Sequence, residues 1–316
     1  MNKAIVILGP TASGKSSLSL ALAKKLDIEI ISLDSALIYE DMDIGTAKPT
    51  RAELKSVPHH LINIVDPKDS YSAANFRNDC IRLVDEISAR GRIPVICGGT
   101  MMYYKALVDG LSPLPETDPK VREEIAKEAE VHGWPYIHSL LKDIDPIAFN
   151  KLNPNDKQRV SRALEVYRMT GRAMSSFFVD QGDKCPFERL EFILLPETDD
   201  RTELRVLIKQ RFLQMVDDGL IDEVACLKER GDLNLNKPSM RCVGYRQVWE
   251  YLDKQYDFDK MIELCVNATS HLAKHQMTWL RGSLSKDNHA LLKKKLIIGD
   301  KRNLEILLEA VKPYFS

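Results

Sequence analysis

Apolar and polar residues are arranged along the chain in two patterns, one typical of buried strands and the other of amphipathic helices. Short apolar runs predict strands in the first third of the chain, at residues 3–8, 29–33, 61–65 and 92–97. Apolar residues at helical spacing predict helices between them, at 15–26 and 72–90. Strands that alternate with helices in this way form a parallel sheet with helices on both faces. The pattern therefore predicts an α/β fold.

A proline-containing segment at residues 111–117 interrupts the alternation. The residues that follow, up to about 178, are mostly polar with helical spacing, and one more strand is predicted at 191–195. From residue 202 onward the pattern is helical throughout. We therefore expect three parts: the first part of the core at 1–114, an all-helical insertion domain at 115–181, and the remainder of the core with a helical C-terminal region at 182–316.

Composition and charge exclude several broad classes of protein. The 316 residues carry a net charge of −1, so a polyanion would have to be bound by a local cluster of cations. The six cysteines include no C-x-x-C pair, which favours reduced thiols over disulfides or zinc ligands. The first apolar run is too short for a signal peptide, and no stretch is long enough to span a membrane. We therefore expect a cytoplasmic monomer with no membrane contact and no obligatory protein partner.

The segment after the first strand matches the phosphate-binding pattern G-x-x-x-x-G-K-[ST], in the strand–turn–helix context that gives this pattern its meaning. Its glycines allow backbone N–H groups to curl around a diphosphate, and the helix N-terminus adds a favourable dipole. Lys15 can reach the outer phosphate, and the Ser16 hydroxyl suits Mg²⁺, which takes few protein ligands. The motif predicts a P-loop NTPase-like fold in which a diphosphate or nucleotide is bound, with Mg²⁺ at Ser16, by Gly9, Pro10, Thr11, Ala12, Ser13, Gly14, Lys15 and Ser16. By itself the motif does not distinguish ATP from another diphosphate.

Polar residues also follow two other predicted strands. Asp34 comes directly after the second strand, and Gly98-Gly99-Thr100 follows the strand at 92–97. Ligands of parallel sheets bind beyond the carboxyl ends of the strands, so Gly9, Asp34 and Thr100 are expected to converge on one crevice. The Asp34 carboxylate could ligate Mg²⁺, accept a proton from a nucleophile, or only cap the turn that follows.

Several motifs, in the same order, resemble those of the bacterial tRNA dimethylallyltransferases, also called tRNA isopentenyltransferases. They are Gly-Pro-Thr-Ala-Ser-Gly-Lys-Ser at 9–16, Asp-Ser-Ala-Leu-Ile-Tyr at 34–39, Met-Asp-Ile-Gly-Thr-Ala-Lys-Pro at 42–49, Gly-Gly-Thr at 98–100 and Arg-Cys-Val-Gly-Tyr-Arg at 241–246. The resemblance extends over nearly the whole chain. It implies that a dimethylallyl group passes from dimethylallyl diphosphate to the N6 amine of the adenosine at position 37 of tRNA, next to the anticodon. The implied products are N6-(dimethylallyl)adenosine and diphosphate, and the implied substrates are tRNAs that read codons beginning with U.

The resemblance also implies roles for individual residues in this transfer. An aromatic amine is a weak nucleophile, so a base must take its proton as the C–N bond forms, and Asp34 matches that base. The leaving diphosphate gathers negative charge, and Arg211 matches the family's diphosphate-binding arginine. On sequence alone, Arg211 could instead belong to a solvated helix face with Arg205 and Lys209. Thr100 matches the threonine of the family's Gly-Gly-Thr turn, whose hydroxyl can meet the diphosphate or the reacting base.

The phosphates of a tRNA anticodon stem-loop need cations even on a neutral protein, and three segments provide them. No acid occurs at 238–246 or at 270–281, and a third group of cations lies in the predicted insertion. Tyr245 is expected to add a stacking surface, and His271 to share one helix face with the cations near it. With the resemblance, these segments predict tRNA contacts at Asp34, Ser35, Ala36, Leu37, Thr100, Arg122, Gln158, Arg159, Val160, Ser161, Arg162, Arg241, Cys242, Val243, Gly244, Tyr245, Arg246, Lys274, His275, Gln276, Thr278, Trp279 and Arg281.

Two positions depart from the family's pattern. Leu37 stands where many relatives have glutamine, which puts the hydrogen bonding to the reacting base in doubt. The triplet Lys-His-Gln at 274–276 stands where Lys-Arg-Gln is common, so His275 makes that contact less charged at neutral pH. Neither position belongs to the predicted diphosphate site.

Three other functions are compatible with parts of the sequence. In a kinase, the phosphate loop would hold ATP, Asp34 would activate an alcohol, and Arg159 with Arg162 would form a lid pair. Prenyl transfer to a free adenine nucleotide would use the same donor site without RNA. An RNA-binding protein with a vestigial phosphate loop would not need the intact Lys15 and Ser16. The acid-free helical segments oppose the first two functions, and the intact loop opposes the third.

Overall fold

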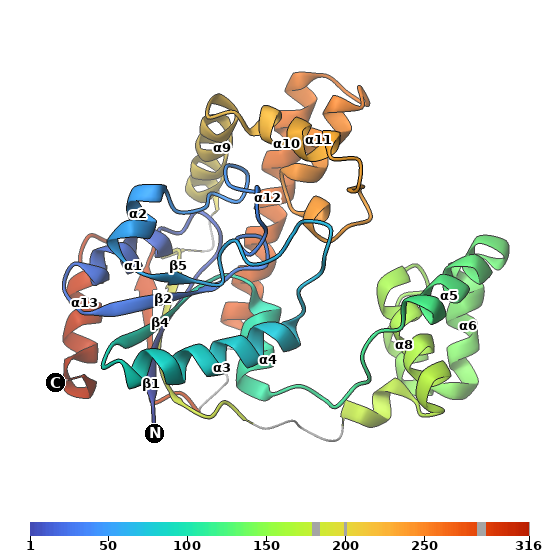
Figure 1. Cartoon of the computed structure of the whole chain (residues 1–316), viewed down its shortest axis with the longest axis horizontal. Coiled ribbons are helices and arrows are strands. Elements are labelled where there is room, and N and C mark those ends of the chain that lie inside the picture. The colour runs from blue at the N-terminus through green and yellow to red at the C-terminus, as the bar shows by residue number, and fades with distance from the viewer. Residues whose placement is uncertain (179–183, 199–200, 283–288, 316) are drawn as a thin grey trace. The chain divides into compact units, whose positions relative to one another are not determined.

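The computed structural model describes residues 1–178, 184–198, 201–282 and 289–315. Its described strands form one sheet in the order β3-β2-β4-β1-β5-β6, in which every neighbouring pair is parallel. The strands are β1 (Lys3–Leu8), β2 (Ile28–Leu33), β3 (His59–His60), β4 (Ile93–Gly98), β5 (Glu188–Leu195) and β6 (Leu292–Ile297). Helices surround this sheet (Figure 1). The predicted α/β class with a parallel sheet is confirmed.

The helices of the first half connect the strands and then form the segment that was predicted as an insertion. They are α1 (Lys15–Ala23), α2 (Arg51–Ser56), α3 (Ala73–Ala89), α4 (Met101–Asp109), α5 (Pro119–His132), α6 (Trp134–Ile144), α7 (Pro146–Lys151), α8 (Lys157–Thr170) and the 3₁₀ helix η1 (Met174–Phe178). The second half contains α9 (Thr202–Asp217), α10 (Leu220–Glu229), η2 (Ser239–Arg241), α11 (Tyr245–Leu252), α12 (Phe258–Arg281), α13 (Asn303–Val311) and η3 (Lys312–Tyr314).

The central strands are covered on both faces. Every residue from Ala4 to Leu8 of β1 is fully buried, as a strand between two layers of helices requires. Ile5 and Ile7 pack in one cluster with Leu22 of α1 and Leu307 of α13. The helix α3 contacts β1, β2 and β4. The apolar runs therefore form the core, and the polar residues with possible chemical roles lie at the ends of the strands.

Two strands differ from the prediction. The strand expected at 61–65 is replaced by the two residues of β3, because Leu61 and Asn63 adopt positive φ angles of 62° and 53° that end the extended backbone. Of the expected range, Val65 forms an isolated bridge with Tyr39. The region after residue 202 is not helical throughout, because β6 pairs with β5 from Leu190↔Leu292 to Leu195↔Ile297.

The segment Val108–Lys184 forms a compact unit of its own, separate from the unit built by 1–107 and 185–316. Its helices enclose a core to which α5 contributes Ile125, α6 contributes Ile137 and Leu141, and α8 contributes Val160 and Leu164. The predicted boundary between 181 and 182 lies outside the described residues. An α-helical unit with its own apolar core can be held together independently of the sheet.

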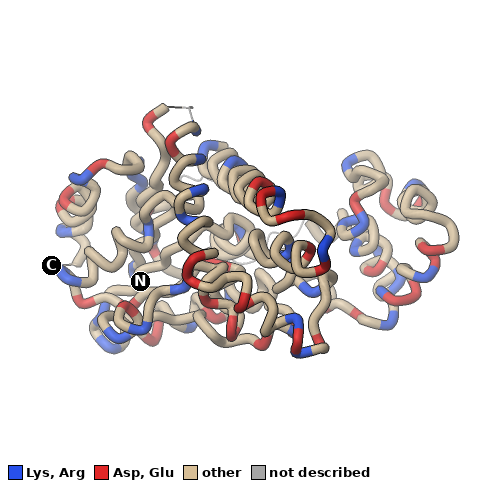
Figure 2. Tube along the Cα trace, turned by 90° about the horizontal axis from the view of Figure 1, so that it is seen from above, with Lys and Arg blue, Asp and Glu red and all other residues tan. Residues whose placement is uncertain are grey.

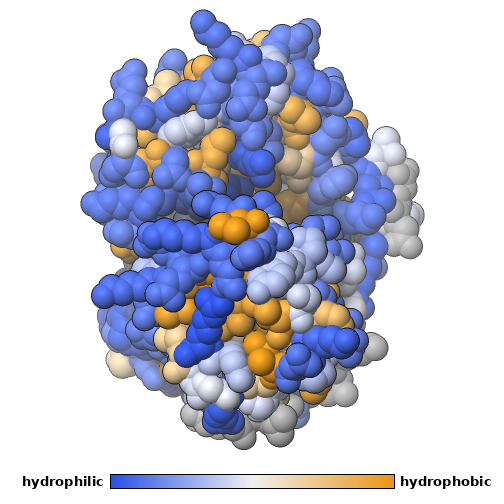
Figure 3. Space-filling view, turned by 90° about the vertical axis from the view of Figure 1, so that its right-hand side faces the viewer, coloured by the Kyte–Doolittle hydropathy of each residue, from blue (hydrophilic) through white to orange (hydrophobic). Residues whose placement is uncertain are grey.

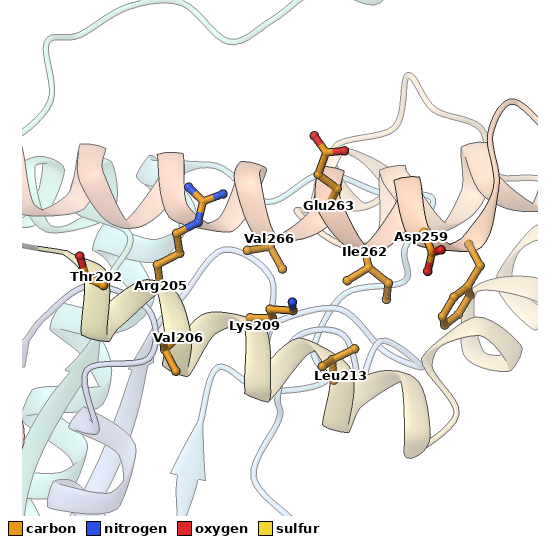
Figure 4. A pocket seen from close by; sticks show the side chains of 10 residues that line it. Thr202, Arg205, Val206, Lys209, Leu213, Asp259, Ile262, Glu263 and Val266 are labelled. Carbon is orange, nitrogen blue, oxygen red and sulfur yellow. The ribbon is translucent and has the colours of Figure 1, made fainter.

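Among the described residues, no helix is long and apolar enough to cross a membrane. The face shown in Figure 3 is mostly hydrophilic, with smaller apolar patches between the polar side chains. Isolated apolar residues are normal on the surface of a protein, so these patches alone indicate no function.

Glu29 of β2 is a buried carboxylate at the far end of the strand from Asp34. It accepts hydrogen bonds from Arg90 at 3.0 and 2.7 Å and from Arg92 at 3.3 Å, and its Oε2 lies 2.6 Å from Nε2 of His60. Burial raises the pKa of Glu29, but the hydrogen bonds from Arg90 and His60 outweigh it and lower this pKa to about 2. The cluster joins β2 to β3 and to the end of α3, so it is a structural feature.

Replacing Glu29 by glutamine is expected to lower the free energy of unfolding at neutral pH by roughly 3 kcal/mol. The reason is that a carboxyl with an ordinary pKa of 4.5 and a folded pKa of about 2 stabilises the fold in its ionised form. This contribution is complete above pH 4.5 and is lost as the pH falls toward 2. Urea unfolding of both proteins at decreasing pH should therefore show their stabilities converging. The exposed ion pair of Glu86 with Arg82 provides a control, since Glu86→Gln should cost less than about 1 kcal/mol.

Candidate active site

The carboxyl ends of three neighbouring strands bring the predicted chemical groups to one edge of the sheet. Gly98 of β4 pairs with Leu8 of β1 on one side and with Leu33 of β2 on the other. The residues that follow these ends are Gly9, Asp34 and Gly99, so the three segments are adjacent, as predicted. Gly98 has to be a glycine, because a Cβ atom there would lie 2.1 Å from the carbonyl oxygen of Leu33.

The phosphate loop is held in its curled conformation by its own backbone and by Lys15. Gly14 has a φ of 81°, a left-handed conformation that glycine adopts without strain, and α1 begins directly after it. The Nζ atom of Lys15 donates to the carbonyl oxygen of Pro10 at 3.0 Å. The hydroxyl of Ser13 is buried and has no hydrogen-bond partner among the described residues. Ser16, in the first turn of α1, is exposed.

Two cationic side chains act electrostatically on Asp34. Burial lowers the pKa of Lys15, the nearby Asp34 carboxylate opposes this change, and Arg211 adds to it. Burial likewise lowers the pKa of Arg211 on α9, again opposed by Asp34. Arg211 was predicted from a resemblance and is the one of these residues that lies far away in the sequence. Its electrostatic interaction with Lys15 and Asp34 brings it near this edge of the sheet, although its side chain remains exposed on α9.

The Asp34 carboxylate has one oxygen engaged and one available. Its Oδ1 accepts hydrogen bonds from the backbone N–H groups of Ala36 at 2.8 Å and Leu37 at 3.4 Å. Its Oδ2 makes no hydrogen bond within the described part of the chain. The Thr100 hydroxyl oxygen accepts a hydrogen bond from the N–H of Ser35 at 3.0 Å. The turn is therefore fixed in place, and a free carboxylate oxygen remains for chemistry.

Cys242 and Tyr103 also lie within the electrostatic reach of Asp34. Burial and the Asp34 carboxylate raise the pKa of Cys242 to about 12. Burial, Tyr39 and Asp34 raise the pKa of Tyr103. Both groups therefore stay neutral at physiological pH. Cys242 is therefore not a thiolate nucleophile.

The RNA-facing residues predicted on α12 are mostly exposed. Lys274, His275, Thr278 and Arg281 are exposed and Trp279 is half-buried. Gln276, which was predicted among them, is directed inward instead. Its side chain accepts from the N–H of Thr11 at 2.8 Å and donates to the carbonyl oxygen of Gly99 at 2.8 Å.

The segment 241–246 divides into exposed cations and a buried tyrosine. Arg241 and Arg246 are exposed, while Cys242 and Val243 are half-buried and Gly244 is buried. The predicted stacking surface of Tyr245 is wrong, because this side chain is fully buried and its hydroxyl donates to Glu223. Figure 2 shows Lys and Arg mixed with Asp and Glu along the trace, in agreement with the net charge of −1.

The predicted residues of the helical unit lie at the start of α8 and on α5. Gln158 and Arg159 are exposed and Ser161 is half-buried, but Val160 packs in the core of the unit and offers no side chain to RNA. Arg122 and Arg162 both reach the fully buried carboxylate of Glu165, at 3.2 and 2.8 Å. Glu165 also accepts from the N–H of Asp118 at 2.8 Å. Glu165 thus orients two of the arginines predicted to contact tRNA.

Replacing Glu165 by alanine is expected to lower the free energy of local opening of the helical unit by about 2 kcal/mol. Removing one partner of a buried ion pair leaves the other charges without compensation, although Arg122, with its side chain 48% exposed, recovers some hydration. Amide hydrogen exchange of α5 and α8 measures this opening directly. Glu128→Ala, which removes the partner of Arg168 at the surface, should change exchange far less. Equal effects of the two variants would contradict a special role for Glu165.

Glu223 of α10 is a further residue that the sequence did not single out. Its carboxylate accepts from three successive backbone N–H groups, those of Asp43, Ile44 and Gly45, at 2.9, 2.7 and 3.1 Å. It therefore holds the 42–49 motif against α10. A Cβ atom at Gly45 would lie 2.5 Å from the ring of Tyr245, so this glycine permits the close approach. The motif has a structural function, because it anchors the segment that follows the Asp34 turn.

Comparisons with known proteins place these features in a family context. The chain matches the family model described as IPP transferase over residues 37–283. The full-length tRNA isopentenylpyrophosphate transferase of Bacillus halodurans is 32% identical, covers 100% of this chain and 97% of its own, and superposes with a TM-score of 0.69. The tRNA delta(2)-isopentenylpyrophosphate transferase of Staphylococcus epidermidis is 29% identical over 99% and 98%, with a TM-score of 0.66. A eukaryotic dimethylallyltransferase acting on tRNA is 28% identical over 98% and 78%, with a TM-score of 0.82.

Proposed function

The chain belongs to the IPP transferase family and is a tRNA isopentenyl (dimethylallyl) transferase, and on that premise we propose which bond it forms. The C1 carbon of dimethylallyl diphosphate is transferred to the N6 amine of adenosine 37, next to the anticodon of tRNAs that read codons beginning with U. The products are N6-(dimethylallyl)adenosine and diphosphate. The observation that carries the proposal is that the phosphate loop and the Asp34 turn follow neighbouring strand ends, with Lys15 and Arg211 in electrostatic reach of Asp34.

In the proposed reaction Asp34 is the general base. As the N6–C1 bond forms and the C1–O bond to diphosphate breaks, the N6 amine loses a proton, and the free Oδ2 of Asp34 takes it. The Oδ1 atom keeps the turn in place through the Ala36 N–H. The Asp34 carboxylate therefore both holds the turn and accepts the proton.

The donor diphosphate is proposed to lie in the phosphate loop. Its charge increases as the C1–O bond breaks, so preorganised cations and N–H groups lower the barrier. Lys15 and Arg211 are proposed to be the cations that meet this charge, and both interact electrostatically with Asp34. The Thr100 hydroxyl, which accepts a hydrogen bond from the N–H of Ser35, is proposed to meet the diphosphate or the reacting base. An ATP-binding reading of the same loop rests on the motif alone.

The Ser16 hydroxyl is proposed as a ligand of Mg²⁺. Mg²⁺ prefers oxygen ligands and takes one or two from the protein, with the rest from water and phosphate. The Ser16 hydroxyl is exposed directly after Lys15, and the buried Ser13 hydroxyl is without a partner among the described residues, which suits a loop built around a bound anion. Ser16 would hold the ion, which when bound would neutralise charge on the diphosphate.

The tRNA is proposed to be bound through its anticodon stem-loop by three surfaces. They are the exposed cations of 241–246, the exposed residues at the end of α12, and Arg122 and Arg159 of the helical unit. Adenosine 37 has to leave its stack for the amine to reach Asp34, at a cost of about a few kcal/mol. The Ser35, Ala36 and Leu37 backbone next to Asp34 is proposed to meet the extruded base.

A product assay tests the proposed reaction. Purified protein with Mg²⁺ and unmodified tRNA is incubated with dimethylallyl diphosphate, and the digested nucleosides are examined by mass spectrometry. A parallel sample contains ATP instead of the prenyl donor. The expected result is N6-(dimethylallyl)adenosine that maps to position 37 and forms with the prenyl donor alone. Release of ADP without a prenylated nucleoside would overturn the proposal in favour of a kinase.

A further inference from the structure

We propose that Gln276 is a positioning residue of the donor site, rather than a contact to tRNA. Its side-chain amide links two loops that are far apart in the sequence, the phosphate loop at Thr11 and the turn at Gly99. Both hydrogen bonds are 2.8 Å long and end on backbone atoms. The inference rests on the proposed function, because it assigns Gln276 to the binding of the diphosphate.

The fit around Gln276 is too close for an accidental contact. A Cβ atom added to Gly99 would lie 2.7 Å from Nε2 of Gln276 and 2.9 Å from the carbonyl oxygen of Gly9. The glycine therefore provides the space that the glutamine fills. The amide oxygen accepts from one loop and the amide nitrogen donates to the other, so the orientation of the Gln276 amide is fixed by the loops.

Each of the two hydrogen bonds fixes a segment that carries chemistry. Thr11 is next to Ala12, whose φ of 61° is unusual for alanine, and Pro10, whose carbonyl oxygen accepts from Lys15 Nζ. Gly99 is next to Thr100, which holds the Ser35 N–H beside Asp34. Gln276 therefore sets the position of the cationic loop relative to the turn that carries the base. Small displacements of reacting groups lower the reaction rate strongly. The distance between the phosphate loop and the Asp34 turn should therefore affect both donor binding and turnover.

The neighbours of Gln276 provide the contrast that separates the two interpretations. Lys274, His275 and Thr278 are exposed, whereas Gln276 is half-buried against the loops. If Gln276 contacts tRNA, replacing it should weaken tRNA binding. If Gln276 is a positioning residue, replacing it should change the KM for the donor and kcat instead.

The test is Gln276→Met, which keeps the length of the side chain and removes both hydrogen bonds. We expect the KM for dimethylallyl diphosphate to rise about tenfold and kcat to fall about tenfold. The Kd for unmodified tRNA, measured without donor, should change less than twofold. Gln214→Met is the matched control, because Gln214 is exposed on α9 and bonds to Asp218; its parameters should equal those of the wild type.

A second variant keeps the test available if Gln276→Met does not fold. Gln276→Glu retains an acceptor for the Thr11 N–H but offers no donor to Gly99, so the rise in donor KM and the fall in kcat should again appear with tRNA affinity preserved. Weakened tRNA binding with an unchanged donor KM, in either folded variant, would overturn the inference and leave the proposed function standing. Wild-type protein that binds tRNA but not dimethylallyl diphosphate would overturn the proposed function, and this inference with it.

Discussion

Asp34→Asn is expected to lower kcat for prenyl transfer by about 10²–10⁴-fold, with donor and tRNA affinities within severalfold of the wild type. The substitution distinguishes the two roles that the sequence left open. Asparagine keeps an Oδ1 atom that can accept from the Ala36 N–H at 2.8 Å, so the turn survives. It replaces the free Oδ2, the proton acceptor, by an amide group that cannot accept a proton. Single-turnover formation of the prenylated nucleoside, followed by mass spectrometry, measures the effect on chemistry alone.

The matched control for this experiment is Asp41→Asn. Asp41 is exposed, and its φ of 58° is a conformation that asparagine adopts readily, so the change in charge comes without strain. The control should retain wild-type turnover. If Asp34→Asn retained kcat within about threefold, Asp34 would be a turn cap and the base would have to be sought elsewhere.

The convergence of the site could be predicted because it follows from backbone topology. Gly9, Asp34 and Gly99 each follow an apolar run, and parallel strands that lie side by side end at one edge. The position of Arg211 could not be derived in this way, because the fold of α9 over that edge depends on tertiary packing. A resemblance to a family supplied it, and its electrostatic interaction with Asp34 supports it.

The elements that were missed have local causes. The strand β6 has the sequence Leu-Lys-Lys-Lys-Leu-Ile, and Leu296 is its one fully buried residue, so it lacks the apolar run of an inner strand. Lysines on an edge strand discourage pairing with another chain, which explains why the pattern is polar. The helix α2 does have a signal in the sequence. Thr50 and Glu53 form a capping box, a pattern of two residues three apart that marks a helix start.

The polar contacts that build the site could not be predicted from one sequence. Gln276 reaches Thr11 across 265 residues and Glu223 reaches Gly45 across 178. Gln276 and Glu223 are each a polar residue on an amphipathic helix, and such a residue is ordinarily expected to face solvent. Tyr245 shows the converse error. Its neighbours in the sequence are cationic and exposed, but the ring itself fills the space left by Gly45.

Lys15→Met is expected to lower kcat/KM for dimethylallyl diphosphate by about 10³-fold, with loss of both donor affinity and turnover. The Lys15 ammonium interacts electrostatically with Asp34, and burial strengthens the interaction of its charge with a nearby anion. Its removal leaves Arg211 to balance the charge that grows on the leaving diphosphate. Titration calorimetry with inorganic diphosphate and with dimethylallyl diphosphate measures the binding part, and single-turnover kinetics measures the chemical part.

Lys25→Met, at an exposed position just beyond the end of α1, is the matched control and should bind both ligands as the wild type does. Because Lys15 is proposed to bind the donor rather than tRNA, the tRNA affinity of Lys15→Met should be preserved. A variant that kept prenyl transfer within about threefold would show that the donor lies outside the phosphate loop. A variant that lost tRNA affinity instead would place the nucleic acid, rather than the prenyl diphosphate, against this loop, and the roles proposed for Arg211 and Ser16 would then fail together.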